Sequence, residues 1–243
     1  MAMSTGSTVR VGLVTGALLL LLCGGRGGER VLAAAPINTP HLDTVLRQMD
    51  AASKSFKSAQ ANIRREIFTK VVNDTDEQTG IIYFLRKGGT TQMGMKMTSP
   101  PEQVMEYKDG KVRVYTPGTK HLDEVSAAGD NKARFDTFLT LGFGGSGRDL
   151  ESAWTIQDDG TESVSDGEKM VSTEKLDLVS NDPDVKKTVS RVTIWMDPVR
   201  DVSLKQILYF PNGNSQTAFY SKIVQNKSID MKPFTIPCKD KCS

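Results

Sequence analysis

The chain has 243 residues and a formal net charge of +2, with 31 basic and 29 acidic side chains. This length allows one sizeable domain or two small ones. Its contents of charged and aromatic residues are not those of a disordered, collagen-like or coiled-coil chain. The near balance of charge argues against nucleic acid or an anionic membrane surface as the main partner, because both require a basic excess or patch.

The N-terminus has the pattern of a secretory signal peptide over residues 1–35. Arg10 supplies the positive region, and the apolar run Val11–Cys23 has 13 residues, too few to span a bilayer as a helix. Small residues at 33–35 offer cleavage after any of three alanines. Cleavage just before Pro36 is the least favoured of these, because the rigid imino acid fits badly after the scissile bond.

Removal of residues 1–35 would leave 28 basic and 28 acidic side chains, since three arginines and one glutamate would be lost. We therefore expect an exported, soluble protein of the periplasm. The alternative is a lipoprotein signal with lipid attached at Cys23. That signal requires a small residue before the cysteine, and Leu22 is not small.

Two cysteines, Cys238 and Cys242, lie four positions apart near the C-terminus. In an oxidising compartment they can form a disulfide, whose stabilising effect would be modest because the closed loop is short. A zinc site is not indicated. The chain has only His41 and His121 as histidines, and neither has ligand spacing to the cysteines.

The first element after the signal is predicted to be an amphipathic helix. Thr39 can cap it, and Pro40 suits the first helical position. Apolar residues then recur at helical spacing, with charged residues on the opposite face. We expect this helix to lay its stripe on another apolar surface. The stripe consists of Leu42, Val45, Leu46, Met49, Ala52 and Phe56.

Six strands are expected next, separated by turns. The Asp109–Gly110 turn is a strong hairpin signal. In the third strand Met93, Met95 and Met97 share one face, and methionine fills irregular apolar space without imposing one shape. That face is either an ordinary sheet core or a lining that adapts to a flexible apolar guest. The expected strands are 61–72, 79–87, 91–98, 102–108, 111–117 and 119–125, with a turn at 73–76.

A change in the spacing of apolar residues, from strand-like to helical, predicts a short helix that begins near residue 131 and includes Leu141. The glycine-rich segment Gly142–Gly147 follows, and its letters fit G-x-G-x-x-G. A dinucleotide fingerprint must follow a strand and open a helix, whereas here a helix precedes the glycines. We interpret the segment as a mobile connection to a second short helix at 148–152.

The remainder returns to alternating strands and turns. Such a repeat predicts an antiparallel meander, and no linker divides it, so we expect a single domain over 36–243. A sheet this long must curl. The predicted class is mainly β (α+β): an unclosed antiparallel β-barrel of about 10–11 strands, with the N-terminal helix and short lid helices over its concave face. The later strands are expected at 154–157, 169–178, 188–196, 202–210, 216–225 and 234–237.

Catalytic constellations are not evident. His121 lies between Lys120 and Asp123 at a turn, where a solvated histidine is expected rather than a general base. The acidic residues at 158–159 and 182–184 are typical of turns, without EF-hand spacing, and no carboxylates are paired in an apolar setting. We expect neither an enzyme nor a bound metal or cofactor.

Several stretches match one known pattern in order along the chain. It consists of a strand ending in a basic pair at Phe84–Lys87, a strand ending before a proline at Met97–Pro100, and a DGK hairpin at Lys108–Val112 followed by Tyr115–Pro117. This pattern resembles the periplasmic outer-membrane lipoprotein carriers, the LolA-like family. Further stretches are similar to that family's lid helix and closing strands: 134–141, 195–197, 207–210 and 234–237.

The resemblance implies an unclosed barrel whose apolar concave face is lidded by helices. It implies that an acylated lipoprotein is taken from an inner-membrane ABC transporter, sheltered, and delivered to an outer-membrane acceptor. A monomer that does not bind nucleic acid is expected. The alternative function is a periplasmic sensor of the same fold, which binds lipid or mislocalised lipoprotein and signals to a membrane partner.

The family's lid is held closed by an arginine at a strand end, and Arg86 has the matching position. Arg86 is in phase with Ile82 and Phe84, so we expect it to point inward, where its charge needs hydrogen-bonding partners. The alternative is that it reaches solvent at the strand end. The residues expected to gate the lid are Arg86, Phe135, Phe138, Leu139, Gly142 and Gly144. Those expected to line the lipid cavity are Ile82, Phe84, Met93, Met95, Met97, Tyr107, Val112 and Val114.

Overall fold

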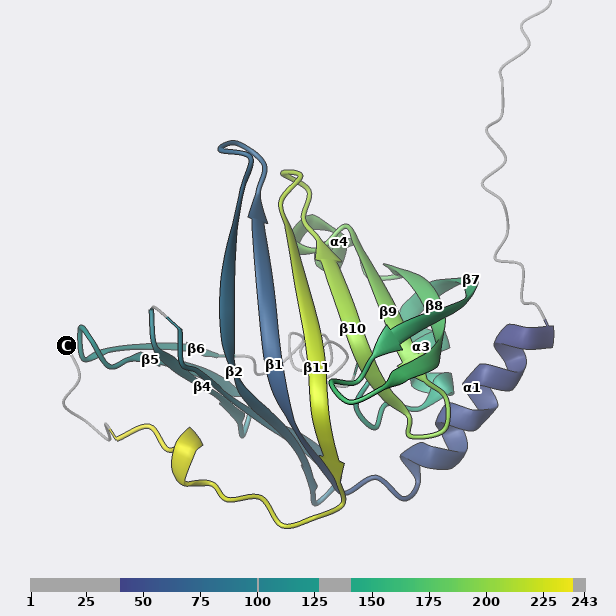
Figure 1. The fold of residues 1–243 in the computed structure, drawn as a ribbon, viewed down its shortest axis with the longest axis horizontal. Coiled ribbons are helices and arrows are strands. Elements are labelled where there is room, and N and C mark those ends of the chain that lie inside the picture. Colours follow the sequence, from purple (N-terminus) through teal and green to yellow (C-terminus); the bar gives the residue numbers. More distant parts are fainter. Residues whose placement is uncertain (1–39, 100, 127–140, 238–243) are drawn as a thin grey trace, which may run out of the picture. The chain divides into compact units, whose positions relative to one another are not determined.

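The computed structural model describes residues 40–99, 101–126 and 141–237, all within one compact unit of the chain. Eleven strands in these ranges form a single antiparallel sheet that is not closed (Figure 1). The mainly β class and the open sheet expected from the sequence are therefore confirmed. The strands are β1 Ser58–Thr69, β2 Asp74–Lys87, β3 Thr90–Met97, β4 Gln103–Lys108, β5 Lys111–Thr116, β6 His121–Ser126, β7 Trp154–Ser165, β8 Met170–Ser180, β9 Arg191–Asp197, β10 Val202–Tyr209 and β11 Ser215–Gln225.

The sheet consists of two meanders that meet at the first and last strands. Its order is β6-β5-β4-β3-β2-β1-β11-β10-β9-β8-β7, so only the β1–β11 pair joins distant segments (Figure 1). In that pair Ile63 lies opposite Tyr220. The other neighbours follow one another in sequence, and most are joined by turns, such as that of the predicted hairpin, in which Asp109 and Gly110 have φ of 52° and 73°. Positive φ at both central residues is the geometry that favours Asp-Gly in such turns.

The turn after β1 lies at 70–73, earlier than the sequence suggested. Asn73 takes a φ of 49°, which asparagine tolerates better than most residues. The chain can therefore reverse before Asp74, and β2 pairs with β1 from Asp74 onward. The two strands form a hairpin that is longer than predicted.

A short helix, α4 (Pro183–Thr188), replaces the turn expected at 182–184. The Asp182 side chain accepts a hydrogen bond from Asp184 N at 2.8 Å and caps the helix, and Pro183 occupies its first turn. Both are ordinary signals for a helix start. The predicted second helix near residue 148 is present as α3 (Gly147–Ala153), capped by Ser146.

The segment 234–237 is not the strand that the sequence suggested. The chain instead forms a 3₁₀ turn, η1 (Lys232–Phe234), and then runs without regular structure. The edge of the Phe234 ring meets Tyr83, with centroids 4.6 Å apart, and Ile236 packs with Val104 and Tyr115. These side chains hold the segment on the sheet by apolar contacts in place of strand pairing.

The helix α1 (Pro40–Ser53) lies with its apolar stripe against the sheet. Leu42, Val45, Leu46 and Met49 are buried in one cluster with Leu176, Leu178, Val192 and Ile194 of β8 and β9. In β9, Val192 and Ile194 lie opposite Leu208 and Gln206 of β10, so all four share one face of the sheet. The helix therefore covers the β8–β9 side of that face.

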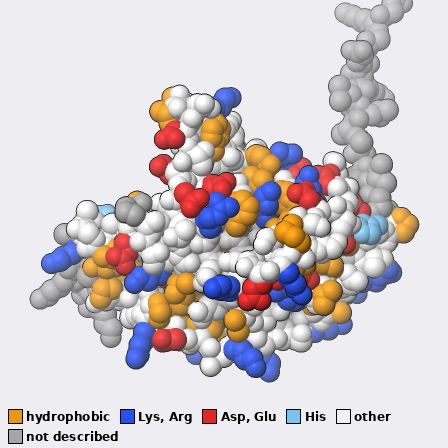
Figure 2. Space-filling model, viewed as in Figure 1, with side chains coloured by type: hydrophobic (Ala, Val, Ile, Leu, Met, Phe, Trp, Pro, Cys, Tyr) orange, Lys and Arg blue, Asp and Glu red, His pale blue; other side chains and the backbone are white. Residues whose placement is uncertain are grey.

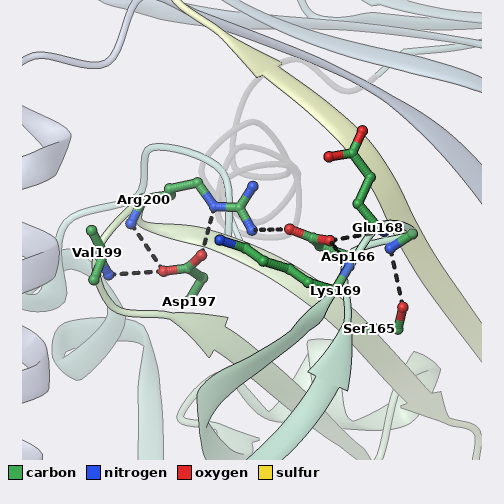
Figure 3. A network of polar contacts seen from close by, with 8 residues as sticks. Ser165, Asp166, Glu168, Lys169, Asp197, Val199 and Arg200 are labelled. Atoms are coloured by element: carbon green, nitrogen blue, oxygen red, sulfur yellow. Dashed lines mark hydrogen bonds and ion pairs between the residues drawn. The ribbon is translucent and has the colours of Figure 1, made fainter.

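A network of polar contacts joins the β7–β8 turn to the β9–β10 turn (Figure 3). Arg200 Nε donates to Asp197 at 2.6 Å, and Arg200 Nη2 donates to Asp166 at 3.2 Å. Asp166 also accepts from the backbone N–H groups of Lys169 and Glu168, both at 3.0 Å. These backbone hydrogen bonds are the main reason why the pKa of Asp166 is lowered, and Arg200 lowers it further.

The face shown in Figure 2 carries acidic and basic side chains interspersed, with scattered hydrophobic ones. None of the helices in the described ranges is long and apolar enough to cross a membrane. Apart from Leu141, the helix predicted near 131–141 lies outside the described residues, as do Cys238 and Cys242.

Candidate functional site

A cavity of about 530 Å³ lies on the same face of the sheet, over the part that α1 does not cover. Strands β1–β4, β10 and β11 contribute to its wall, and so do Val185 of α4 and Val189, which caps the C-terminus of this helix. Since α4 connects β8 to β9, the sheet curves enough to bring this helix to the same cavity as the residues of β2–β4. The wall is mainly apolar and includes Ile63, Leu141, Leu208 and Ala218.

The strand register explains why β2–β4 present apolar side chains together. Phe84 lies directly opposite Met93, and Ile82 lies opposite Met95. Met95 in turn lies opposite Met105. Residues paired in this way point to the same face of a sheet, so all five side chains line the cavity.

The eight residues expected to line a lipid cavity lie on this face at different depths. Four of them, Ile82, Phe84, Met93 and Met95, contribute to the cavity wall. Met97 and Tyr107 are buried in the adjoining core cluster, and half-buried Val112 packs against it. Val114 is also half-buried and lies opposite Met105.

Sequence reasoning missed the rest of the cavity wall. Met105 alternates with Tyr107 along β4 and could have been found by the same two-residue periodicity. Residues from β1, β10, β11 and α4 could not have been found in this way, because no local sequence pattern pairs β1 with β11. The missed residues include Arg65, Val185, Gln206, Ala218 and Tyr220.

The polar groups of the wall are bound mainly to one another or to the backbone. Tyr220 Oη donates to Gln206 Oε1 at 3.1 Å, and Gln206 Nε2 donates to Leu141 O. Burial raises the pKa of the Tyr220 hydroxyl, which therefore stays protonated. Satisfied polar groups of this kind leave the cavity apolar toward a guest.

Arg86, at the end of β2, is hydrogen-bonded. Hydrogen-bonding partners are what the inward-pointing alternative required for its charge. Its Nη1 donates to Ser53 O at 2.6 Å, and its Nη2 donates to Gly144 O. The Phe56 ring lies 5.4 Å from its guanidinium. Arg86 thus connects β2 to the end of α1 and to the glycine-rich segment.

Arg86 also lines a second cavity, of about 590 Å³, whose wall includes Ser53, Ser146 and Asp149. This cavity is the larger one by volume. Its wall carries much more polar surface than that of the first cavity. The smaller, apolar cavity is therefore the better candidate for a hydrocarbon guest.

The glycine-rich segment is anchored by Phe143. Its ring stacks on Phe84 with centroids 4.3 Å apart and meets Tyr220 edge-on at 4.9 Å. Gly142 and Gly144 have φ of 80° and 76°. A Cβ at Gly144 would lie 2.3 Å from the Phe56 ring, so only glycine fits there without displacing it. The other expected gating residues, Phe135, Phe138 and Leu139, lie outside the described residues.

A buried carboxylate, Asp201, lies near Arg86 and was not anticipated from the sequence. It is 2% exposed, and neither carboxylate oxygen has a hydrogen-bond partner among the described residues. Burial raises the pKa of Asp201 to about 8; the charge of Arg86 acts to lower it and that of Asp50 to raise it. Asp201 lines a small cavity of about 170 Å³ together with Phe56 and Asn226.

The histidines lie away from the apolar cavity wall. His41 Nδ1 lies 2.8 Å from Asp158, and the hydrogen bond with Asp158 is the main reason why the pKa of His41 is raised. His121 is exposed and lies 3.0 Å from Asp123. Within the described ranges, no three residues of the types His, Cys, Asp and Glu are grouped so that they could hold a metal ion.

No family model matches the sequence, and no curated protein matches it. Solved structures do resemble it. The crystal structure of MucB has 11% sequence identity, covers 82% of this chain and 64% of that one, and gives a TM-score of 0.51. The Pseudomonas aeruginosa MucA/MucB complex has 13% identity, with 81% and 61% covered and a TM-score of 0.49. A LolA superfamily protein from Nitrosomonas europaea has 15% identity, with 80% and 97% covered and a TM-score of 0.38.

At these identities the likeness concerns the fold alone, and this chain spans less than two thirds of the length of the MucB chains. The TM-score of 0.51 indicates that MucB shares its overall fold. The chain thus has a LolA-like fold, as the order of its sequence elements led us to expect.

Proposed function

We propose that this protein is a periplasmic carrier that shelters acyl chains of a lipoprotein or lipid and delivers them toward the outer membrane. The observation that carries this proposal is the apolar cavity of about 530 Å³ between β1–β4, β10, β11 and α4. Its volume lies within the roughly 300–1,000 Å³ typical of ligand sites. Residues 1–35 act as the cleaved export signal, and 36–243 form the binding domain.

The energetics of hydrocarbon in water support a cavity of this kind. Each methylene buried from water contributes about 0.8 kcal/mol, so a carrier must offer an apolar wall over the length of the chain. Met93, Met95 and Met105 supply such a wall. Their unbranched, polarizable side chains can adjust to chains of different shape.

Arg86 serves as a latch in this proposal. Its bonds to Ser53 and Gly144 tie the end of α1 and the glycine-rich segment to β2. Leu141, which directly precedes this segment, lines the cavity, and Phe143 of the segment packs on the wall residue Phe84. Release of Arg86 would let this segment turn at Gly142 and Gly144 and admit cargo.

The partners come from the family resemblance. An inner-membrane ABC transporter would load the carrier, and an outer-membrane acceptor would unload it. No catalytic step is needed, since binding and release suffice. A disulfide between Cys238 and Cys242 would close the C-terminal end in the oxidising periplasm.

The test replaces cavity methionines with a polar residue. Met93→Ser/Met95→Ser should weaken binding of a fluorescent fatty acid at least tenfold, because two apolar wall side chains are lost. Met170→Ser is the matched control, since Met170 is 63% exposed in β8. Circular dichroism checks that each variant is folded. Unchanged binding by a folded double variant would show that the cavity does not hold acyl chains.

A second candidate is a sensor that binds lipid or mislocalised lipoprotein and signals to a membrane partner. The fold likeness to MucB favours it, because MucB has been crystallised in complex with periplasmic MucA. Transfer assays separate the two. A carrier loaded with labelled lipoprotein should pass its cargo to outer-membrane vesicles, whereas a sensor should retain it.

A further inference from the structure

The apolar cavity contains one arginine that the proposed function does not yet use. Arg65, on β1, is the only cation among the described residues that line the cavity. It lies opposite Ala218 on β11 and Gln78 on β2, so its side chain is on the cavity face. An isolated charge in such a setting is costly unless it is paired.

No carboxylate among the described residues pairs with Arg65. Its Nε donates to Gln78 Oε1 at 3.1 Å, and its Nη2 donates to the same oxygen. A neutral amide satisfies two N–H groups but does not compensate the charge. In agreement, burial lowers the pKa of Arg65; the Tyr220 hydroxyl acts to raise it, but no described aspartate or glutamate does.

The nearby carboxylates are engaged elsewhere. Glu66 and Glu77 pair with Arg64, which lies on the opposite face of β1. Asp184, the one carboxylate in the described cavity wall, pairs with Lys187 at 2.8 Å. Among the described residues, two carboxylates therefore compensate Arg64 and none compensates its neighbour Arg65.

The remaining N–H groups of Arg65 are suited to an anion. A guanidinium carries five donors in a planar fork that matches the oxygens of a carboxylate or phosphate. The wall around it grades from buried apolar residues, such as Ile82 and Phe84, to exposed polar ones, such as Asp184 and Thr188. A guest with a hydrocarbon chain and a charged head would match this gradient.

We infer that the cavity takes a single-chain amphiphile with an anionic head group, a carboxylate or a phosphate, whose oxygens bind the Arg65 guanidinium. The chain lies against the wall formed by Ile82, Phe84 and Met95. This inference rests on the proposed function and names the class of lipid that the cavity prefers.

The test compares three ligands that share an oleyl or oleoyl chain: oleate, oleoyl lysophosphatidic acid and neutral oleyl alcohol. Displacement of a fluorescent acyl probe from the purified protein measures each affinity below the critical micelle concentration. At least one anion should bind about 10- to 100-fold more tightly than the alcohol, the range expected for hydrogen bonds to a charged group. The tighter anion identifies a carboxylate or a phosphate as the preferred head.

Variants then assign the preference to Arg65. Arg65→Gln should lower the ratio of anion affinity to alcohol affinity to about one. Arg64→Gln, which alters the neighbouring arginine on the other face, should leave this ratio at its wild-type value. The wild-type comparison of anion with alcohol remains decisive even if Arg65→Gln does not fold.

The possible failures can be distinguished. Equal affinity of wild-type protein for all three ligands would overturn the role of Arg65 and leave an acyl-binding function intact. An anion preference that survives in folded Arg65→Gln would also overturn it. Absence of binding of every ligand would overturn the proposed function together with this inference.

Discussion

At the scale of single residues, the region around the cavities differs from an ordinary sheet because ionisable side chains are buried there. Arg65 and Arg86 are held by an amide and by backbone carbonyls, respectively. Asp201 is buried without a hydrogen-bond partner among the described residues. Unsatisfied buried groups lower stability, and they are retained where a protein needs them for function or conformational change.

Asp201→Asn should increase stability more at pH 8 than at pH 5. The folded pKa of Asp201 is raised to about 8, above the value of about 3.9 in an unfolded chain. The folded state therefore binds the extra proton, and its stability falls as pH rises through this window. We expect the free energy of unfolding to increase by about 1–3 kcal/mol at pH 8.

Urea unfolding of wild-type and variant protein at both pH values measures this effect. Asparagine tolerates the φ of 52° at this position as aspartate does, so backbone strain does not confuse the comparison. A stability difference that is independent of pH would contradict a buried ionisation at Asp201.

At the scale of elements, the pairing of β2 with β3 places the apolar residues of the cavity wall. The same register puts Gly94 opposite Tyr83 on the other face. A Cβ on Gly94 would lie 2.2 Å from the Tyr83 ring. Tyr83 in turn meets Phe234 of the C-terminal segment edge-on, so one glycine allows three elements to pack together.

Gly94→Ala should lower the free energy of unfolding by about 1–3 kcal/mol, the range for overpacking a buried site. Gly118→Ala is the control, because a Cβ there would meet no atom within 4 Å. Thermal unfolding compares the two. Equal midpoints for both variants would show that the Tyr83 ring moves aside without cost.

At the scale of the whole molecule, the cavity exists because distant elements are brought together. The β1–β11 pair joins the two meanders, and α4 faces the wall that β2–β4 supply. Arg86 connects α1, β2 and the glycine-rich segment at one side of this assembly. Cargo exchange should therefore depend on Arg86 more than on any single wall residue.

Arg86→Met should accelerate release of a bound fluorescent fatty acid several-fold, because two charge-assisted hydrogen bonds that hold the segment are lost. Stability should fall by about 1–3 kcal/mol for the same reason. Lys87→Met is the matched control at the exposed end of the same strand. Stopped-flow displacement measures the release rate. Equal rates for both variants would contradict the latch.

Local patterns explain the parts that were predicted correctly. Alternation over 91–98 placed three methionines on one face, helical spacing identified the α1 stripe, and Asp109–Gly110 identified a hairpin. Each depends on neighbours within a few residues. The expected strand at 234–237 was wrong because its apolar residues pack on Tyr83, Val104 and Tyr115 without pairing.

By itself, the sequence determined the antiparallel strands, the apolar face of β2–β4 and the helix that covers part of the sheet. Only the tertiary structure decided that β1 pairs with β11 and that Arg65 lies on the cavity face with no carboxylate partner in the described part of the chain. The physical reason is the distance along the chain over which each kind of interaction acts. Periodicity and turn chemistry act over a few residues, whereas β1 and β11 are segments more than a hundred positions apart, and their pairing places Arg65 opposite Ala218 on the cavity face.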